Sequence, residues 1–345
     1  MKKYFVLIKS TRYLVIATLI LIIFALLSLL WGQYSISLST FMNYLEYKLF
    51  TKDIAEVKVF ELIDDIIFNI RLPRVLLAIL IGAALAISGA VFQAMFVNPL
   101  VSPGILGVLS GASFGAALGM VLSEHWYIVQ ICAFLFGFVA VFFAVLVGVM
   151  VPNNRSKVML VLGGVISGAL FTSLLSIVKY LADPYSTLPT IVYWLMGSLS
   201  MAQLNSVLLV SIPILLSIFG MIFLRKYFDL MSLGDEEAKA LGVNVNLIRT
   251  VAIVLATIAS SLCVVMAGII GWVGLIIPHI IRMAIGPSHK LLIPLSAIVG
   301  GIFLLLADTV SRLALSVEVP IGIITSLIGI PIFIIVLKNA RATWN

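Results

Sequence analysis

Apolar residues occur along this chain in long uninterrupted stretches. A helix needs about 20 apolar residues, with a range of roughly 17–25, to cross the hydrocarbon core of a bilayer. The sequence predicts ten such segments, of which the eighth is short and follows the tight turn at 268–271. They lie near residues 13–31, 72–95, 104–122, 127–150, 158–180, 205–224, 250–269, 271–286, 291–310 and 319–337.

The composition agrees with a membrane protein. Of the 345 residues, 63% are hydrophobic and 10% are charged, whereas about a quarter of the residues in soluble domains are charged. The first apolar stretch follows a basic start, as in a signal peptide, but it is longer than a typical signal sequence and no small-residue cleavage site follows it. We interpret it as a retained span. Cys132 and Cys263 lie in apolar stretches without the spacing of a metal or redox pair, which favours small buried side chains.

We expect an all-α integral membrane protein with a single transmembrane domain over residues 1–345. Only the loop at 32–70 is long, and its apolar residues recur at near-helical spacing among charged ones, which is typical of an amphipathic segment on the outer surface. In the third span, small residues recur every four positions and make a smooth stripe on one helix face. Packing within the chain and a homodimer interface both fit this stripe, and the first is favoured; it consists of Gly107, Gly111, Gly115 and Gly119.

The net charge of +7 is read first as a signal of orientation, because lysine and arginine are enriched in cytoplasmic loops. With the N-terminus inside, two thirds of the 21 basic residues fall on the cytoplasmic side. An even number of spans then returns the C-terminus to the same side. The charge therefore indicates lipid and topology, and no nucleic-acid partner is expected.

The segment 230–246 is the most unusual polar stretch. Ser232 precedes Asp235 by three residues, as a helix cap precedes its reciprocal acid, and Glu236 and Glu237 complete an acidic first turn. Gly242 supplies a helix stop. A helix of about nine residues cannot cross a bilayer or persist alone in water. Because the cytoplasmic lipid surface is anionic, we expect this acidic helix to rest on another protein; a capped turn that touches nothing is the alternative.

No catalytic motif or metal site is recognisable. The phosphate-binding loop, the zinc-binding H-E-x-x-H pattern, paired carboxylates and the nucleophile elbow are all missing from the sequence. We therefore expect no enzyme activity; if the protein is driven by ATP, the ATPase is a separate chain. We also expect the ionisable residues to lie near span ends or in loops, which disfavours an ion-coupled secondary carrier with mid-membrane charges.

Several short motifs resemble one known family, the FecCD-type permeases of type II ABC importers for iron chelates and vitamin B12. The resemblance follows the order of the family motifs over nearly the whole chain. In the first half it rests on Arg71-Leu72-Pro73-Arg74, the small-residue run 82–89, Gln93, Asn98-Pro99-Leu100 and Pro103-Gly104. In the second half it rests on Leu233-Gly234, Ala240-Leu241-Gly242, the run 271–282, Ala307-Asp308, Arg312 and Pro320-Ile321-Gly322.

The resemblance implies a dimer of permease subunits around a central pathway, with a homodimer expected and a close heterodimer as the alternative. It also implies two ATP-binding subunits that carry ATP and Mg, and a periplasmic or lipid-anchored substrate-binding protein; this chain itself would bind no cofactor. The segment 230–246 would be the coupling element that sits in a cleft of the ATPase. The residues assigned to this coupling are Ser232, Leu233, Gly234, Asp235, Glu236, Glu237, Ala240, Leu241 and Gly242.

The resemblance assigns further sites. Arg71, Arg74 and Arg312 would dock the binding protein at the outer side, although anchoring of span ends to headgroups fits them equally well. Asn98 and Leu100 would narrow the cytoplasmic gate, against the alternative of a plain turn. A short helix at the outer mouth would carry Trp194 and Gly197, for which an interfacial aromatic anchor is the alternative.

Together these features predict the permease subunit of an ATP-driven importer in the bacterial cytoplasmic (inner) membrane, with both termini in the cytoplasm. Alternating access powered by separate ATPase subunits would translocate an iron chelate such as a siderophore. The same machinery for cobalamin, haem or molybdate is the alternative, and a secondary transporter or a membrane-embedded enzyme is less favoured.

Overall fold

The computed structural model describes residues 2–50, 57–150 and 157–341, and every regular element in these ranges is helical. The ten predicted spans are confirmed as ten apolar helices. Seven are at least 18 residues long and apolar enough to cross a membrane, and three are shorter. In chain order the helices are α1 (Lys2–Leu30), α4 (Leu72–Phe96), α5 (Val108–Leu122), α6 (Trp126–Val149), α7 (Lys157–Leu181), α9 (Leu204–Phe223), α12 (Val245–Ala267), α13 (Val273–Ile285), α14 (His289–Leu313) and α15 (Ile321–Arg341).

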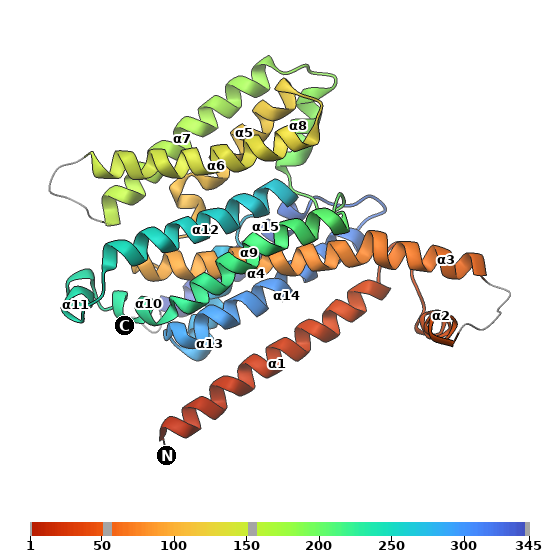
Figure 1. Cartoon of the computed structure of the whole chain (residues 1–345), viewed down its shortest axis with the longest axis horizontal. Coiled ribbons are helices and arrows are strands. Elements are labelled where there is room, and N and C mark those ends of the chain that lie inside the picture. Colours follow the sequence, from red (N-terminus) through yellow and green to blue (C-terminus); the bar gives the residue numbers. More distant parts are fainter. Residues whose placement is uncertain (1, 51–56, 151–156, 342–345) are drawn as a thin grey trace.

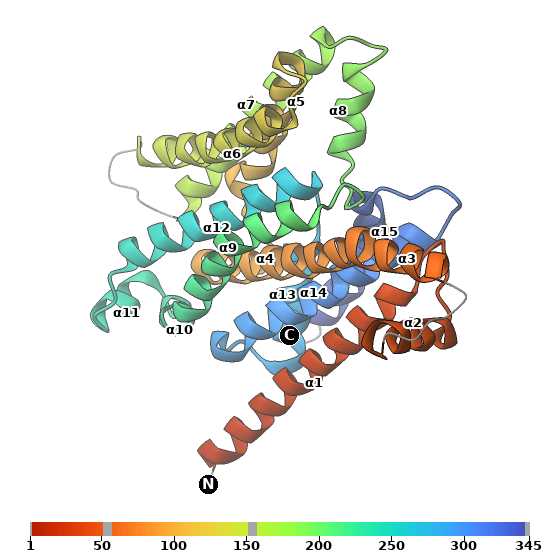
Figure 2. The same cartoon turned by 45° about the vertical axis from the view of Figure 1, so that its right-hand side comes forward.

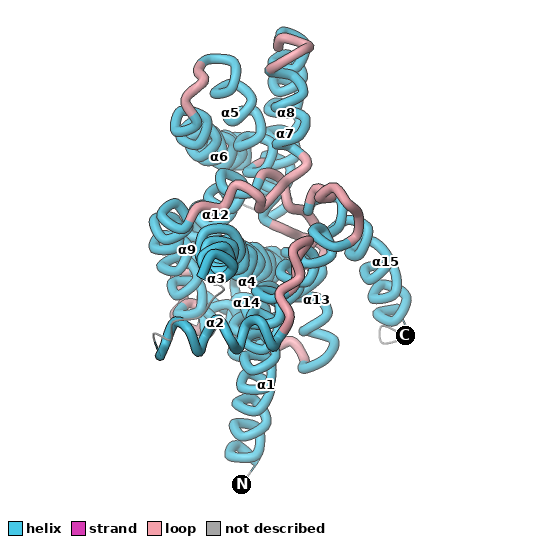
Figure 3. The backbone as a smooth tube through the Cα atoms, turned by 90° about the vertical axis from the view of Figure 1, so that its right-hand side faces the viewer, coloured by secondary structure: helices cyan, strands magenta, loops and turns pink. Residues whose placement is uncertain are grey.

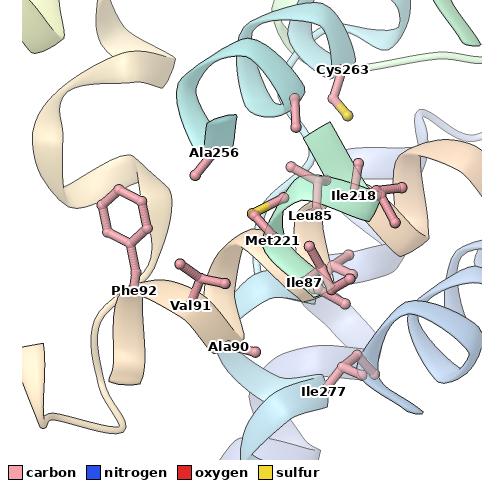
Figure 4. Close-up of a cluster of buried hydrophobic side chains, with 14 of the residues drawn as sticks. Leu85, Ile87, Ala90, Val91, Phe92, Ile218, Met221, Ala256, Cys263 and Ile277 are labelled. Carbon is pink, nitrogen blue, oxygen red and sulfur yellow. The ribbon is translucent and has the colours of Figure 1, made fainter. Parts of the chain in front are cut away.

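Helix α4 is the centre of the molecule, with α9, α12, α13 and α14 packed around it (Figure 1). Its apolar side chains pack against those of its neighbours, as Leu85 and Ile87 of α4 do beside Met221 of α9 in Figure 4. Close approach of helices needs small residues, because a membrane offers little hydrophobic drive for helix association. Gly82 of α4 faces Gly300 of α14 so closely that a Cβ on either would overlap the carbonyl of the other.

Helices α5, α6 and α7 form a separate group beside α12 (Figure 2). The glycine stripe of α5 lies in this group: a Cβ on Gly111, Gly115 or Gly119 would meet the backbone of α6. The expectation that the stripe serves packing within the chain is therefore confirmed for these three positions.

The loop expected at 32–70 is largely helical. It contains α2 (Leu38–Phe50), α3 (Val57–Asp65) and the π-helix η1 (Ile66–Arg71), which leads directly into α4. The second span is thus part of a longer rod that projects beyond the bundle, and α2 crosses its end (Figure 3). Ile36, Tyr44, Phe60 and Ile63 form a small core of their own there. The helical periodicity expected in this segment is present, and its place on the outer surface stays a prediction. Helix α4 begins at Leu72, as expected for the second span, but α3 and η1 continue it upstream, which was not predicted.

Two short helices, α10 (Arg225–Met231) and α11 (Asp235–Ala240), lie at the opposite end of the bundle from α2 and α3 (Figure 1). We call this the α11 end and the other the α3 end. Helix α1 begins, and α15 ends, toward the α11 end. The remaining short elements are the 3-10 helix η2 (Pro103–Leu106), which precedes α5, and α8 (Thr187–Leu195), which lies between α7 and α9.

Candidate functional site

The acidic segment folds into a helix at the expected place, but shorter and with a different start. Helix α11 has six residues, and Gly234, at φ 130°, is its N-cap residue. The prediction that Ser232 caps it is wrong, because the Ser232 hydroxyl donates to the carbonyl of Asp229 at 2.8 Å. Glu237 folds back over Gly234, in the space that a Cβ would need. The positive φ favours glycine at the start of α11, whereas the Glu237 side chain is flexible and could move aside for a Cβ.

The end of α11 follows the sequence prediction. Gly242 adopts φ +83°, its amide donates to the carbonyl of Lys239, and the amide of Val243 donates to the carbonyl of Ala238. This pair of bonds is the Schellman motif, in which a left-handed glycine satisfies the last carbonyls of a helix. The buried side chains of Ala238 and Val243 then fix α11 against the rest of the protein.

Asp235, the first residue of α11, is tied to two spans. Its carboxylate lies 2.6 Å from Nη2 of Arg249 in α12 and 3.0 Å from Nζ of Lys157 at the start of α7. Partial burial alone would raise the pKa of Asp235, but the hydrogen bonds from Arg249 and Lys157 outweigh it and lower that pKa. Movement of α11 is therefore linked electrostatically to α7 and α12.

A second carboxylate fixes α10. Oδ1 of Asp229 accepts from the backbone amide of His289 at 2.7 Å and lies 3.0 Å from Nδ1 of the same residue. His289 begins α14, so α10 is fastened to a third span. Asp229, Lys157 and Arg249 were not among the residues assigned to coupling, because pairs this far apart along the chain leave no local sequence pattern.

The side of segment 230–246 that faces away from the spans carries exposed side chains. The side chains of Glu236 and Glu237 are exposed, and Glu236 pairs only with the neighbouring Lys239 among the ion pairs of the described ranges. Leu233 and Leu241 expose 63% and 60% of their surface beside these acids. Exposed leucines beside carboxylates fit a protein partner better than water alone. Of the three acids expected to contact a partner, only Glu236 and Glu237 are available.

The break after α4 is stabilised locally. Val97 adopts a left-handed conformation at φ 51° and ends the helix, and Oδ1 of Asn98 accepts from the amide of Leu100 at 2.9 Å. Asn98 and Leu100 are both exposed at the α11 end. The break and its position follow the sequence prediction, and the role of these residues as a gate stays a prediction.

At the α3 end, the segment after α8 is joined to two other segments by main-chain bonds. The amide of Ser198 donates to Ala267, and the amides of Ile321 and Gly322 donate to Gly197 and Met196. Gly197 has φ +79°, and a Cβ there would lie 2.8 Å from the carbonyl oxygen of Ile269. We call this contact of 196–198, 267–269 and 321–322 the backbone junction. Trp194 and Gly197 thus lie together at the expected end, and their role at a mouth stays a prediction.

The three arginines of the α3 end have partners within the chain. Each is at most 6% exposed. Arg74 donates to Asp308 at 2.7 Å and to Glu318 at 2.8 and 2.9 Å. Arg312 donates to Asp308, the carbonyl of Trp31 and the Ser28 hydroxyl, and Arg71 donates to the carbonyls of Leu29, Leu30 and Tyr34. We call this the arginine cluster.

The arginine cluster joins the end of α1 to the start of α4 and the end of α14. This arrangement differs from the expectation that the arginines anchor span ends by reaching headgroups. It leaves docking of a binding protein untested, but it gives the three side chains a structural role that the sequence did not reveal.

The expectation that ionisable residues stay near span ends needs correction. His279 is in the middle of α13, whereas Asp308, which has no exposed surface, lies within the last two turns of α14, as expected. Asp308 is neutralised by Arg74 and Arg312, whereas neither ring nitrogen of His279 has a hydrogen-bond partner among the described residues. The described spans thus contain an ionisable side chain near mid-helix, His279.

Comparison with known proteins identifies the family. The model of the FecCD transport family matches residues 20–339. The chain is 40% identical to the molybdate import system permease protein MolB of Haemophilus influenzae, covering 95% of this chain and 96% of that protein. It is 37% identical to a probable iron chelatin transport system permease of Helicobacter pylori strain 26695, covering 93% and 96%.

A solved structure agrees with the same assignment. An inward-facing metal-chelate type ABC transporter matches with a TM-score of 0.84 and 38% identity, over 95% of this chain and 99% of that one. Both the sequence and the helical arrangement therefore lead to one conclusion: this chain belongs to the FecCD transport family and has the fold of a type II ABC importer permease.

Proposed function

We propose that this chain is the membrane-spanning permease subunit of an ATP-driven importer for an iron chelate such as a siderophore. The observation that carries the proposal is α11, a short helix with exposed acids, flanked by the exposed Leu233 and Leu241, whose first residue forms ion pairs with two spans. A partner that pushes on the exposed face moves the spans through these ties. The work of ATP hydrolysis would reach the bilayer by this route.

The contacts of Asp235 and Asp229 suggest how a displacement of α10 and α11 would be passed to the spans. Closure of two ATP-binding subunits would displace α10 and α11 together. Asp235 would pass that displacement to α7 and α12, and Asp229 would pass it to α14. Because α14 packs along the central α4, a tilt of α14 changes the environment of the whole core. Asn98 and Leu100, at the same end, would open and close the inner gate.

The proposal includes partners and an orientation. A second permease subunit, most simply another copy of this chain, would complete the pathway. Two ATPase subunits carrying ATP and Mg would bind the α11 end, which therefore faces the cytoplasm together with both termini. A substrate-binding protein would dock at the α3 end. The buried and paired state of Arg71, Arg74 and Arg312 favours a role in shaping that end over direct contact with the binding protein.

Two substrate classes have support from relatives. Similarity to an iron chelatin permease and to a metal-chelate type transporter favours a metal chelate, and similarity to MolB favours molybdate as the second candidate. The purified binding protein of the system, titrated with ferric siderophores, molybdate, haem and cobalamin by calorimetry, separates them. Tight binding of molybdate alone would overturn the iron assignment.

The energy source is tested separately. The permease with its ATPase subunits and binding protein, reconstituted in vesicles, should take up substrate with ATP when ionophores abolish ion gradients. Uptake that requires a gradient and continues without the ATPase subunits would instead identify a secondary carrier.

A further inference from the structure

A cleft between α6, α7 and α12 opens at the α11 end. Its volume is about 490 Å³, and apolar side chains line most of it, with Lys157, Asn246 and Arg249 at one end. This volume is within the roughly 300–1,000 Å³ of common ligand sites. An apolar chamber with cations at one end matches a molecule with a long apolar tail and an anionic head.

The lining belongs partly to the exposed surface of the chain. Phe142 of α6 is 69% exposed and Val254 of α12 is 44% exposed, although both line the cleft. The cleft is therefore open sideways as well as at its polar end. Farther along α12, Thr257 also lines it and is 1% exposed, and its hydroxyl has no hydrogen-bond partner among the described residues.

The charges at the polar end are not balanced. Lys157 and Arg249, whose side chains are 22% and 14% exposed, both face the single carboxylate of Asp235. One positive charge is left without an opposite charge among the ion pairs of the described ranges, in a position that water reaches only partly. Basic pockets between spans on the cytoplasmic side are a recurring way to bind anionic headgroups.

From this geometry we propose that the cleft binds one anionic phospholipid, with its phosphate on Lys157 and Arg249 and an acyl chain along Phe142 and Val254. The phosphate shares with Asp235 the two cations that hold α11. Occupation of the cleft therefore weakens the tie between α11 and the spans α7 and α12. The anionic lipid content of the membrane would then adjust how firmly the coupling helix is held.

The inference rests on the proposed function only for its regulatory consequence. Lipid binding can be measured without ATP or substrate, so failure of either idea is distinguishable from failure of the other. Native mass spectrometry of the purified, delipidated permease, titrated with phosphatidylglycerol or phosphatidylcholine, gives the stoichiometry and the affinity. We expect one site that binds phosphatidylglycerol about fivefold more tightly than phosphatidylcholine, because one uncompensated positive charge attracts an anionic headgroup by about 1 kcal/mol.

Charge variants locate the headgroup. Lys157→Gln with Arg249→Gln should abolish the preference for phosphatidylglycerol. Lys226→Gln with Lys290→Gln removes the same charge from exposed positions at the same end and should leave the preference intact. Asp235→Asn frees both cations and should tighten phosphatidylglycerol binding by about a further fivefold. Equal effects of the two double variants would mean general attraction to a basic surface and would overturn the site.

A space-filling variant locates the tail. Val254→Trp should remove the single bound lipid, whereas Val251→Trp, one turn away on α12 and outside the lining, should not. Gel filtration confirms that both variants remain folded. If Val254→Trp separates a permease dimer and leaves phosphatidylglycerol affinity unchanged, the cleft is a subunit interface and the lipid proposal is wrong. Inorganic phosphate that competes as well as the lipid would likewise overturn it.

Discussion

Oδ2 of Asp235 in α11 lies 2.6 Å from Nη2 of Arg249 in α12. The pair joins a helix outside the spans to a helix that crosses the membrane. Lys157 approaches the same carboxylate from α7, so one side chain joins three helices.

Replacing this carboxylate should weaken the join without unfolding the protein. Hydrogen bonds to charged groups contribute about 1.5–3 kcal/mol, and partial exposure reduces that figure here, so we expect Asp235→Asn to lower the melting temperature in detergent slightly. The larger effect should be on coupling, measured as substrate transported per ATP hydrolysed. Unchanged coupling would mean that force passes through Asp229 and α14 alone.

The same pair predicts a pH dependence. The pKa of Asp235 is lowered in the folded protein, so its stabilising contribution is fully present above the pKa of the unfolded chain, about 3.9. The contribution is lost as the pH falls through the lower folded value. The difference in melting temperature between wild type and Asp235→Asn should therefore be constant from pH 7 to pH 5 and shrink below about pH 4. A difference that shrinks already near pH 6 would implicate another group.

The exposed acids should control assembly with the ATPase. Glu236→Lys with Glu237→Lys reverses the charge of the outward face and should reduce co-purification of the ATPase subunits. Glu124→Lys with Glu61→Lys, at exposed positions on the α3 end, should have no such effect. Because acids also stabilise the first turn of a helix by about 0.3–1 kcal/mol, the Gln double variant separates the loss of helix from the reversal of charge. If the ATPase subunits co-purify equally well with the Glu236→Lys and Glu237→Lys variant, α11 is not the docking site.

The stability of the folded protein should depend strongly on Asp308, the acid at the centre of the arginine cluster, and weakly on Glu318 at its edge. Asp308→Ala leaves Arg74 and Arg312 without their shared partner, and breaking a buried pair costs about 3–5 kcal/mol. We expect little folded protein from this variant. Glu318→Gln, whose side chain is 35% exposed, should cost about 1 kcal/mol or less. Yield and melting temperature provide the comparison; similar values for the two variants would show that burial of Asp308 has no energetic consequence.

Close helix contact predicts a contrast between two glycines. A Cβ on Gly82 would overlap the backbone of Gly300, so Gly82→Ala should separate α4 from α14 and cost at least the 1–3 kcal/mol typical of overpacking. Nothing lies within 4 Å of a Cβ on Gly271, and Gly271→Ala should be neutral. Melting temperatures measure both. A neutral Gly82→Ala would show that the two helices can move apart freely.

The ten spans were predictable from the sequence because each is a continuous apolar stretch, and hydropathy depends only on neighbouring residues. The helix stop at Gly242 was predictable for the same reason, since the Schellman motif is local. The start of α11 was not: Ser232 has the right spacing for a cap, but Gly234, which can adopt φ 130°, takes that position instead.

The pairings of charged residues could not be predicted from the sequence. Arg74 and Asp308 are 234 positions apart, and Asp229 and His289 are 60 apart. Each looked like an isolated charge near a span end, and only packing of α4 against α14, and of α10 against α14, brings the partners together. The helical continuation from α3 into α4 was also missed, because the acids at 61–65 interrupt the hydrophobic pattern while the helix continues.

The backbone junction has an evolutionary consequence. Its three segments are held by amide and carbonyl groups, and Gly197, Gly268 and Gly322 allow the approach. Any residue type supplies those groups except proline, which lacks the amide. Side chains at the other positions of the segment after α8 are therefore free to change in evolution while the junction keeps its shape.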